Sequence, residues 1–112
     1  MKINIGDTFW YNDGSSYPEV ATIFDKKVNS IHLQIKYPFI AKYTAINILD
    51  IEKCLFNSKE KSFLSYIERN KIPFDLKGAY ILLTQKVLDE KLKPEQMNEM
   101  FVFIWEKITI KD

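Results

Sequence analysis

The clearest periodic feature of this 112-residue chain is an apolar stripe near its end, in the sequence PEQMNEMFVFIWEKI of residues 94–108. Its apolar side chains recur every three or four residues, which is the spacing of one face of an α-helix, at Met97, Met100, Phe101, Ile104, Trp105 and Ile108. Pro94 followed by Glu95 is a helix-start signal, since proline pre-sets φ and an acid suits the positive helix end. Burying one such side chain stabilises a fold by roughly 1.5–3 kcal/mol, so this stripe predicts a core helix.

The first half of the chain has a period of two instead. Residues 30–37 alternate strictly, which predicts a strand with one buried and one solvated face. Ile31, Leu33, Ile35 and Tyr37 take one side, and His32, Gln34 and Lys36 take the other. Aromatic and β-branched runs predict three more strands, at 8–12, 19–24 and 39–47, with turns between them.

After residue 47 the pattern becomes helical. Asn57 with Glu60 three positions later resembles a capping box, so we expect a short helix from there to about Asn70. Asp75 is the expected cap of a further helix over 79–92. Three segments stay ambiguous: 48–56 fits neither period, while 79–84 and 100–110 could each be a strand.

Strands first and helices afterwards predict an α+β fold, an N-terminal antiparallel meander packed by a C-terminal helical hairpin. The length predicts a single domain over 1–112, β-rich in 1–47 and mainly helical in 48–112.

Composition argues against several classes of function. The 16 basic and 15 acidic residues nearly cancel, and Arg69 is the only arginine, which disfavours guanine reading and bidentate phosphate clamping. The single cysteine, Cys54, excludes an intrachain disulfide and suggests a cytoplasmic protein. No apolar run approaches the roughly 18 residues of a membrane span, and the first ten residues do not read as a secretory signal, so we expect no membrane association.

The sequence carries no recognisable catalytic constellation. His32 is the only histidine, and Cys54 beside Leu55 reads as a buried structural thiol. With one His and one Cys, no zinc site of the usual ligands can form within the chain. Three acids, Asp7, Asp13 and Asp25, fall in turns, where Asp is favoured for backbone reasons. We therefore expect no metal, no cofactor and no enzymatic activity; an enzyme built from His32 and these acids is the third-ranked alternative.

Aromatic residues crowd the β half of the chain. They are Phe9, Trp10, Tyr11, Tyr17, Tyr37, Phe39 and Tyr43. In a strand over 8–12, Trp10 must face opposite to Phe9 and Tyr11, so rings are presented outside the main core unless both faces are covered. The candidate binding residues are Trp10, Tyr11, Tyr17, Lys36 and Tyr43.

The opening Ile5-Gly6-Asp7-Thr8-Phe9, followed by short aromatic strands, resembles the first strand of small SH3-like or Tudor-like barrels. The resemblance covers about forty residues and rests on common residue types. It implies a small barrel in place of the open meander, in a class whose members bind peptides, methylated side chains or nucleic acid. It assigns no residue role.

Two functions follow as expectations. The first is a small interaction protein, of the accessory, inhibitor or immunity type found on mobile elements, that binds a protein partner or itself through exposed aromatics. The second is a small barrel that binds single-stranded nucleic acid through Lys and aromatic stacking. The near-zero net charge makes nucleic-acid binding the less favoured of the two functions, because phosphate contacts normally dominate such affinity.

Overall fold

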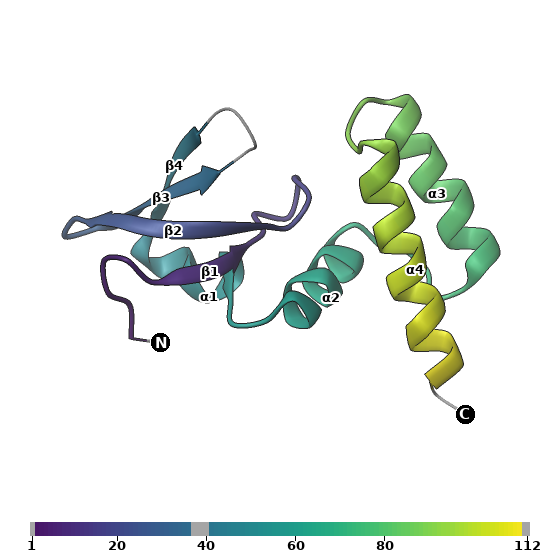
Figure 1. Ribbon diagram of the computed structural model, residues 1–112, viewed down its shortest axis with the longest axis horizontal. Coiled ribbons are helices and arrows are strands. Elements are labelled where there is room, and N and C mark those ends of the chain that lie inside the picture. The colour runs from purple at the N-terminus through teal and green to yellow at the C-terminus, as the bar shows by residue number, and fades with distance from the viewer. Residues whose placement is uncertain (1, 37–40, 111–112) are drawn as a thin grey trace. The chain divides into compact units, whose positions relative to one another are not determined.

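The computed structural model describes residues 2–36 and 41–110 (Figure 1). The chain divides into two compact units, Met1–Ser65 and Tyr66–Asp112, and the boundary falls within one helix. The fold is α+β, as predicted, with an antiparallel sheet followed by helices. That the whole chain forms one domain stays a prediction.

The first unit contains a five-stranded antiparallel sheet in the order β4-β3-β2-β1-β5. Its strands are β1 (Thr8–Tyr11), β2 (Glu19–Lys26), β3 (Ser30–Lys36), β4 (Ala41–Asn47) and β5 (Leu55–Phe56). The first four strands pair with their neighbours in sequence, which confirms the meander. Within the described residues the two edge strands, β4 and β5, do not pair with each other, so the sheet is open and no closed barrel forms.

The inner face of the sheet carries the core of this unit. Ile31, Leu33 and Ile35 of β3 are buried, as their alternation predicted, and they pair across the ladder with Ile46 of β4 and with Ile23 and Ala21 of β2. A register shift between Ile23 and Asp25 interrupts the β2–β3 ladder. Such a bulge changes which side of the strand the following side chains take.

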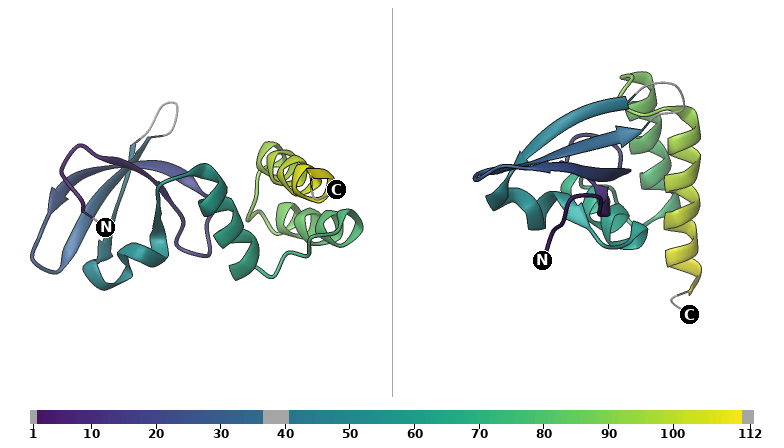
Figure 2. Two further views of the ribbon diagram at one scale, coloured as in Figure 1. Left: turned by 90° about the horizontal axis from the view of Figure 1, so that it is seen from below. Right: turned by 60° about the vertical axis from the view of Figure 1, so that its left-hand side comes forward.

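The ambiguous segment 48–56 forms three short elements. A 3₁₀ turn η1 (Ile48–Asp50) and the single-turn helix α1 (Ile51–Cys54) lie on the inner side of the sheet (Figure 2), and β5 is its edge strand. Asn47 begins the turn, since its side chain accepts a hydrogen bond from the Leu49 amide at 2.8 Å. Cys54 and Leu55 are buried in the core cluster, as is Ile3 from the N-terminal segment. Elements this short have no periodicity to detect.

Helix α2 (Lys59–Arg69) begins one residue later than predicted. Ser58, and not Asn57, is its cap, because the Ser58 hydroxyl accepts a hydrogen bond from the Lys61 amide at 3.2 Å. Serine at 58 and asparagine at 57 are both good caps, so the sequence did not separate them. The predicted end near Asn70 is confirmed.

The second unit is built on an antiparallel hairpin of α3 (Leu76–Leu88) and α4 (Pro94–Ile110), which lie side by side in Figures 1 and 2. Residues 79–84 and 100–110 are therefore helix and not strand. Asp75 caps α3 as predicted, with its carboxylate accepting from the Gly78 amide at 2.6 Å. Pro94 opens α4, and the Gln96 side chain accepts from the backbone amide of Lys93 at 2.9 Å. That the hairpin packs on the sheet stays a prediction.

Candidate interaction surface

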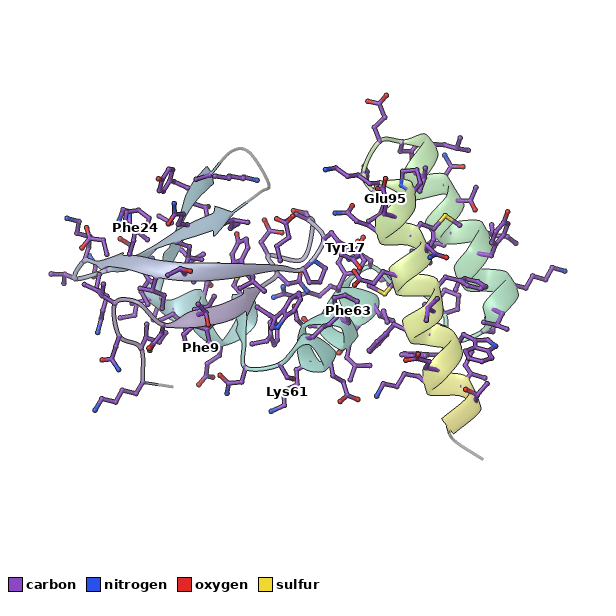
Figure 3. The ribbon with its side chains drawn as sticks, in the orientation of Figure 1. Phe9, Tyr17, Phe24, Lys61, Phe63 and Glu95 are labelled. Carbon is purple, nitrogen blue, oxygen red and sulfur yellow. The ribbon has the colours of Figure 1, made fainter. Side chains whose placement is uncertain are left out.

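The side of the sheet opposite the core, here called the outer face, exposes large apolar side chains. Val20 and Phe24 of β2 are 48% and 42% exposed, and Tyr43 of β4 is 61% exposed. The strand pairing aligns three residues in one row across the sheet: Thr22 of β2, Gln34 of β3 and Tyr43 of β4. Phe24 and Phe9 lie on opposite sides of the sheet (Figure 3), which separates the outer face from the core side.

Three rings meet on the outer face. The Phe24 ring packs edge-on against Tyr43, with centroids 5.3 Å apart, and against His32, with centroids 5.9 Å apart. The Gln34 side-chain amide donates to the Tyr43 hydroxyl at 3.3 Å, and Ser30 Oγ lies 3.3 Å from His32 Nε2. Aromatic pairs of this geometry each contribute about 0.5–1.5 kcal/mol beyond burial, so the cluster is held in a defined arrangement before anything binds it.

The charged groups beside this cluster cancel each other. Lys27 Nζ lies 3.0 Å from the carboxylate of Asp25. The backbone of Asp25 lies opposite His32 in the β2–β3 ladder. The hydrogen bond from Lys27 lowers the pKa of Asp25, with the Lys26 amide adding to the effect. The outer face therefore presents apolar and aromatic surface next to a neutralised ion pair.

Trp10 also lies on the outer face, opposite Val20 in the β1–β2 ladder, but α2 partly covers it. Phe63 of α2 is fully buried and packs edge-on against Trp10, with ring centroids 6.1 Å apart. The same Phe63 ring packs against Tyr17, with ring centroids 5.5 Å apart. Figure 3 labels both residues where α2 and the loop before β2 meet. Trp10 therefore lies at the edge of the exposed surface, where α2 covers the sheet.

Two of the predicted binding residues are inside the protein. Tyr11 is 8% and Tyr17 is 9% exposed, so neither ring is available to a partner. Tyr11 pairs with Leu55 of β5 and joins the inner-face core, and the Phe63 contact holds Tyr17. Burial, and then the nearby Asp13 carboxylate, raise the pKa of Tyr11 to about 12. The sequence could not show this, because the covering elements come from residues 55 and 63.

Of the two predicted binding residues that remain, one is exposed and the other has a side chain that the structure does not describe. Tyr43 is the most exposed of the rings on the outer face. Lys36 ends β3, with its backbone opposite Ala41, and its side chain lies outside what the structure describes. Tyr37 and Phe39 also fall outside the described residues.

Sequence reasoning missed Val20 and Phe24 as members of the surface, and it placed His32 on the solvated side of its strand without counting it as a binding residue. The signal was present, because Val20, Thr22 and Phe24 alternate with the residues Ala21 and Ile23 that turned out to be buried. Recognising it required knowing which of the two faces of β2 is covered.

The groups considered for catalysis lie in varied surroundings. The Cys54 thiol is buried in the core, as expected, and His32 lies among the outer-face rings. Asp7 accepts from the Asn4 amide at 2.9 Å. Asp13 accepts from the amides and hydroxyls of Ser15 and Ser16; burial opposes its ionisation, but these hydrogen bonds outweigh burial and lower its pKa to about 2. Among residues 2–36 and 41–110 no group of three or more His, Cys, Asp or Glu side chains could hold a metal ion.

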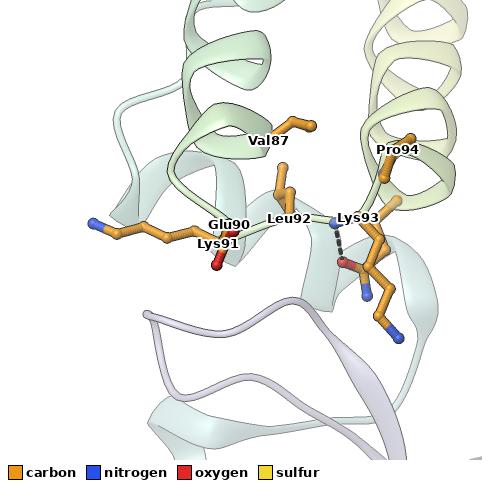
Figure 4. Close-up of a pocket in the computed structure, with 7 residues that line it drawn as sticks. Val87, Glu90, Lys91, Leu92, Lys93 and Pro94 are labelled. Carbon is orange, nitrogen blue, oxygen red and sulfur yellow. Dashed lines mark hydrogen bonds between the residues drawn. The ribbon is translucent and has the colours of Figure 1, made fainter.

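Open pockets occur in both units. One, of about 390 Å³, lies at the α3–α4 turn (Figure 4) and is lined by Val87, Glu90, Lys91, Leu92, Lys93, Pro94 and Gln96. Another, of about 440 Å³, lies beside η1 and is lined by Ile3, Lys26, Ile31, Ile48, Leu49, Ile51 and Glu52. In the second pocket Lys26 Nζ donates to the carbonyl oxygen of Ile3 at 2.8 Å, so this lysine fixes the N-terminal segment.

No helix among the described residues has the length and apolar character that crossing a membrane requires. Comparison of the chain with protein-family models, with curated proteins and with solved structures gives no match in any of the three.

Proposed function

We propose that this protein is a cytoplasmic, non-enzymatic interaction domain whose outer sheet face binds a protein partner. The observation that carries the proposal is the ring cluster of Phe24, His32 and Tyr43, which is ordered by mutual contacts yet exposes Phe24 by 42% and Tyr43 by 61%. Aromatic side chains at the centre of a surface patch supply most of the binding energy in protein interfaces. An inhibitor or immunity-type protein would act through a surface of this kind.

The charge of the surface selects the kind of partner. Because Asp25 and Lys27 neutralise each other beside the rings, this ion pair offers no net positive charge to phosphates. The outer face therefore fits a partner surface with an apolar, uncharged centre, because burying the rings against such a surface costs the least desolvation free energy. The proposal also includes a relationship of the open sheet to SH3-like barrels, which rests on the resemblance of residues 5–9 to the first strand of such barrels.

The test compares three variants as baits in native lysate with quantitative mass spectrometry. Phe24→Asp and Tyr43→Asp place a charge among the rings, while Val28→Asp is the control, since Val28 is 88% exposed in the turn between β2 and β3. We expect a protein that the wild type and Val28→Asp retain and that both ring variants lose. Reconstitution with that purified partner should give a Kd at least about tenfold higher for Tyr43→Asp.

Two results would overturn the proposal. One is the same set of captured proteins for all four baits. The other is salt-sensitive binding of a random single-stranded oligonucleotide, measured by fluorescence anisotropy and abolished by Tyr43→Asp, which would put the nucleic-acid function in its place.

A further inference from the structure

The two edges of the sheet differ in how open they are to another strand. β5 is only two residues long, whereas β4 has seven residues and is the outermost strand on the other side (Figure 1). Within the described residues, β4 pairs on one side only, with β3, in a register that runs without a bulge over its whole length. A long, regular edge strand presents a row of backbone donors and acceptors to which another strand can add.

A hydrogen bond beyond the end of β4 shows which of its backbone groups are open. The Ile48 amide donates to the carbonyl oxygen of Asn29 at 3.0 Å, and this pair continues the β3–β4 register. Directly bonded pairs recur at every second residue of an antiparallel ladder, so the backbones of Ile46, Thr44 and Lys42 bond to β3. The residues between them point their amides and carbonyls away from β3; these open residues are Ala41, Tyr43, Ala45 and Asn47.

The pairing on the other side of β3 agrees with this assignment. The Lys27 amide donates to the carbonyl oxygen of Ser30 at 2.8 Å, in the turn that joins β2 to β3. Ser30 therefore bonds toward β2, and the next residue, Ile31, bonds toward β4. Ile31 lies opposite Ile46, whose backbone faces β3 by the first argument as well.

The open edge of β4 has few of the features that keep other strands away. Tyr43 is 61% exposed, and Ala45 and Asn47 are exposed too. The strand sequence AKYTAIN contains no proline and no glycine. Its one charged residue, Lys42, lies opposite the buried Ile35, so its side chain is on the inner side of the sheet. Short length, proline, bulges and charges are the usual protection of an edge, and β4 has only this one lysine.

β4 complements itself along its full length. A half rotation about an axis through Thr44 lays the strand antiparallel to its own copy, with all seven residues overlapping. Tyr43 then lies opposite Ala45 of the second copy, and Ala41 lies opposite Asn47, so each open residue meets an open residue. A register moved by one residue sets open residues opposite residues that already bond to β3. A register moved by two keeps the bonding pattern but shortens the overlap.

The side chains fit this register as well. On the outer face, the large Tyr43 ring lies opposite the small Ala45 side chain, and the two Tyr43 residues become diagonal neighbours roughly 7–8 Å apart, within reach of aromatic side chains. On the inner side, Lys42 lies opposite Ile46 and not opposite a second lysine, so no like charges face each other. Because Phe24 packs against Tyr43, the ring contacts of one copy continue into those of the other.

We propose that two copies of this chain pair through β4 and join their five-stranded sheets into one continuous antiparallel sheet. The pairing uses backbone groups at the edge, whereas the protein partner proposed above lies against side chains of the outer face. One strand pair buries less than the roughly 800 Å² per side of a standard interface. The dimer is therefore weak, and it exchanges with the monomer on dilution.

The first experiment measures mass by size-exclusion chromatography with light scattering over a dilution series. Ala45→Pro removes an open amide that makes no bond to β3, a change that an edge strand tolerates. We expect it to raise the dimer Kd at least about tenfold, with unchanged circular dichroism. Ala45→Ser keeps the amide and should keep the wild-type mass. The proposal is wrong if the wild type is monomeric at every concentration, or if Ala45→Pro dimerises as well as Ala45→Ser.

The second experiment tests the register and does not depend on the proline variant. Thr44 lies opposite its own copy as a pair without mutual hydrogen bonds, and the Cα atoms of such pairs are about 4.5 Å apart, which a disulfide can span. In a Cys54→Ala background, Thr44→Cys should therefore form a disulfide-linked dimer with oxidised glutathione, seen on a non-reducing gel. Lys42→Cys is the matched control, since the two Lys42 residues lie roughly 13 Å apart along the strands. Equal cross-linking of the two variants, or none in either, contradicts the β4 pairing.

Mass measurements also separate this dimer from the partner binding proposed above. Phe24→Asp changes β2 and should lose the protein partner while keeping the dimer. A dimer that is lost with Phe24→Asp and kept with Ala45→Pro would place self-association on the outer face, and so would overturn pairing through β4.

Discussion

The side-chain amide of Asn12 donates a hydrogen bond to the carbonyl oxygen of Ser62 at 3.2 Å, joining the end of β1 to α2 across fifty positions of sequence. Asn12 is fully buried, and its side-chain oxygen accepts from the Gly14 amide at 2.8 Å. One polar side chain thus fixes both the turn after β1 and the position of α2, whose Phe63 covers Trp10 and Tyr17.

Replacing Asn12 by alanine should lower the free energy of unfolding by about 1–3 kcal/mol, because the Ser62 carbonyl and the Gly14 amide lose buried partners. Urea unfolding followed by circular dichroism measures the change. Asn57→Ala is the control, since Asn57 is exposed, and it should change stability little. Equal effects of the two substitutions would remove the role assigned to Asn12.

Ser62→Ala should raise the free energy of unfolding by about 1 kcal/mol. The Ser62 hydroxyl oxygen is buried without a hydrogen-bond partner, so its removal recovers a desolvation cost, while the backbone carbonyl that receives Asn12 remains. A thermal shift assay should show a higher Tm. A decrease would mean that the hydroxyl finds a partner in solution.

The start of α2 gives a matched pair of neighbouring substitutions. Ser58→Ala removes the side-chain cap of the Lys61 amide and should cost about 0.5–2 kcal/mol of stability. Asn57→Ala removes a residue that lies before the cap and should cost much less. The reverse order in chemical denaturation would restore Asn57 as the capping residue.

Gly78→Ala should destabilise the protein, although alanine normally stabilises a helix by about 1 kcal/mol relative to glycine. A Cβ atom at this position would lie 2.7 Å from Pro73 Cγ and 2.8 Å from Asp75 Oδ2, the carboxylate that caps α3. The expected loss is about 1–3 kcal/mol. Pro73→Ala in the same chain should recover part of it, and no recovery would locate the strain elsewhere.

Asp13 should make stability depend on pH in the acid range. Its folded-state pKa of about 2 lies below the ordinary value of 3.8, so its contribution is complete above the ordinary value and is lost as the pH falls toward 2. After allowance for solvent screening, the contribution is about 1 kcal/mol. Asp13→Asn should flatten stability over that interval in acid titrations of urea midpoints, with Asp50→Asn as the control. An unchanged acid profile for Asp13→Asn would contradict this assignment.

Local pattern predicted most of the elements. The alternation of residues 30–37 gave β3 and its buried side, and the start signals at Asp75 and Pro94 gave the beginnings of the last two helices. These features depend on a few adjacent residues. They could therefore be read without knowing what lies against them.

The candidate surface was only half predictable. The alternation in β1 placed Trp10 opposite Phe9 and Tyr11, and the ladder agrees. Which side would be covered was decided by β5, whose Leu55 lies beside Tyr11, and by Phe63, which takes Tyr17 out of solvent. Those contacts span more than forty positions, and no local pattern contains them.

The sequence by itself determined the class of the fold, the order of its first four strands, and the supply of aromatic side chains in the β half. The tertiary structure alone decided that the sheet is open, that Tyr11 and Tyr17 are inside, and that Phe24 with Tyr43, and Leu88 with Trp105, are outside. The reason is physical. Periodicity states which residues share a face, but burial depends on what packs against that face, and the covering segments come from distant parts of the chain.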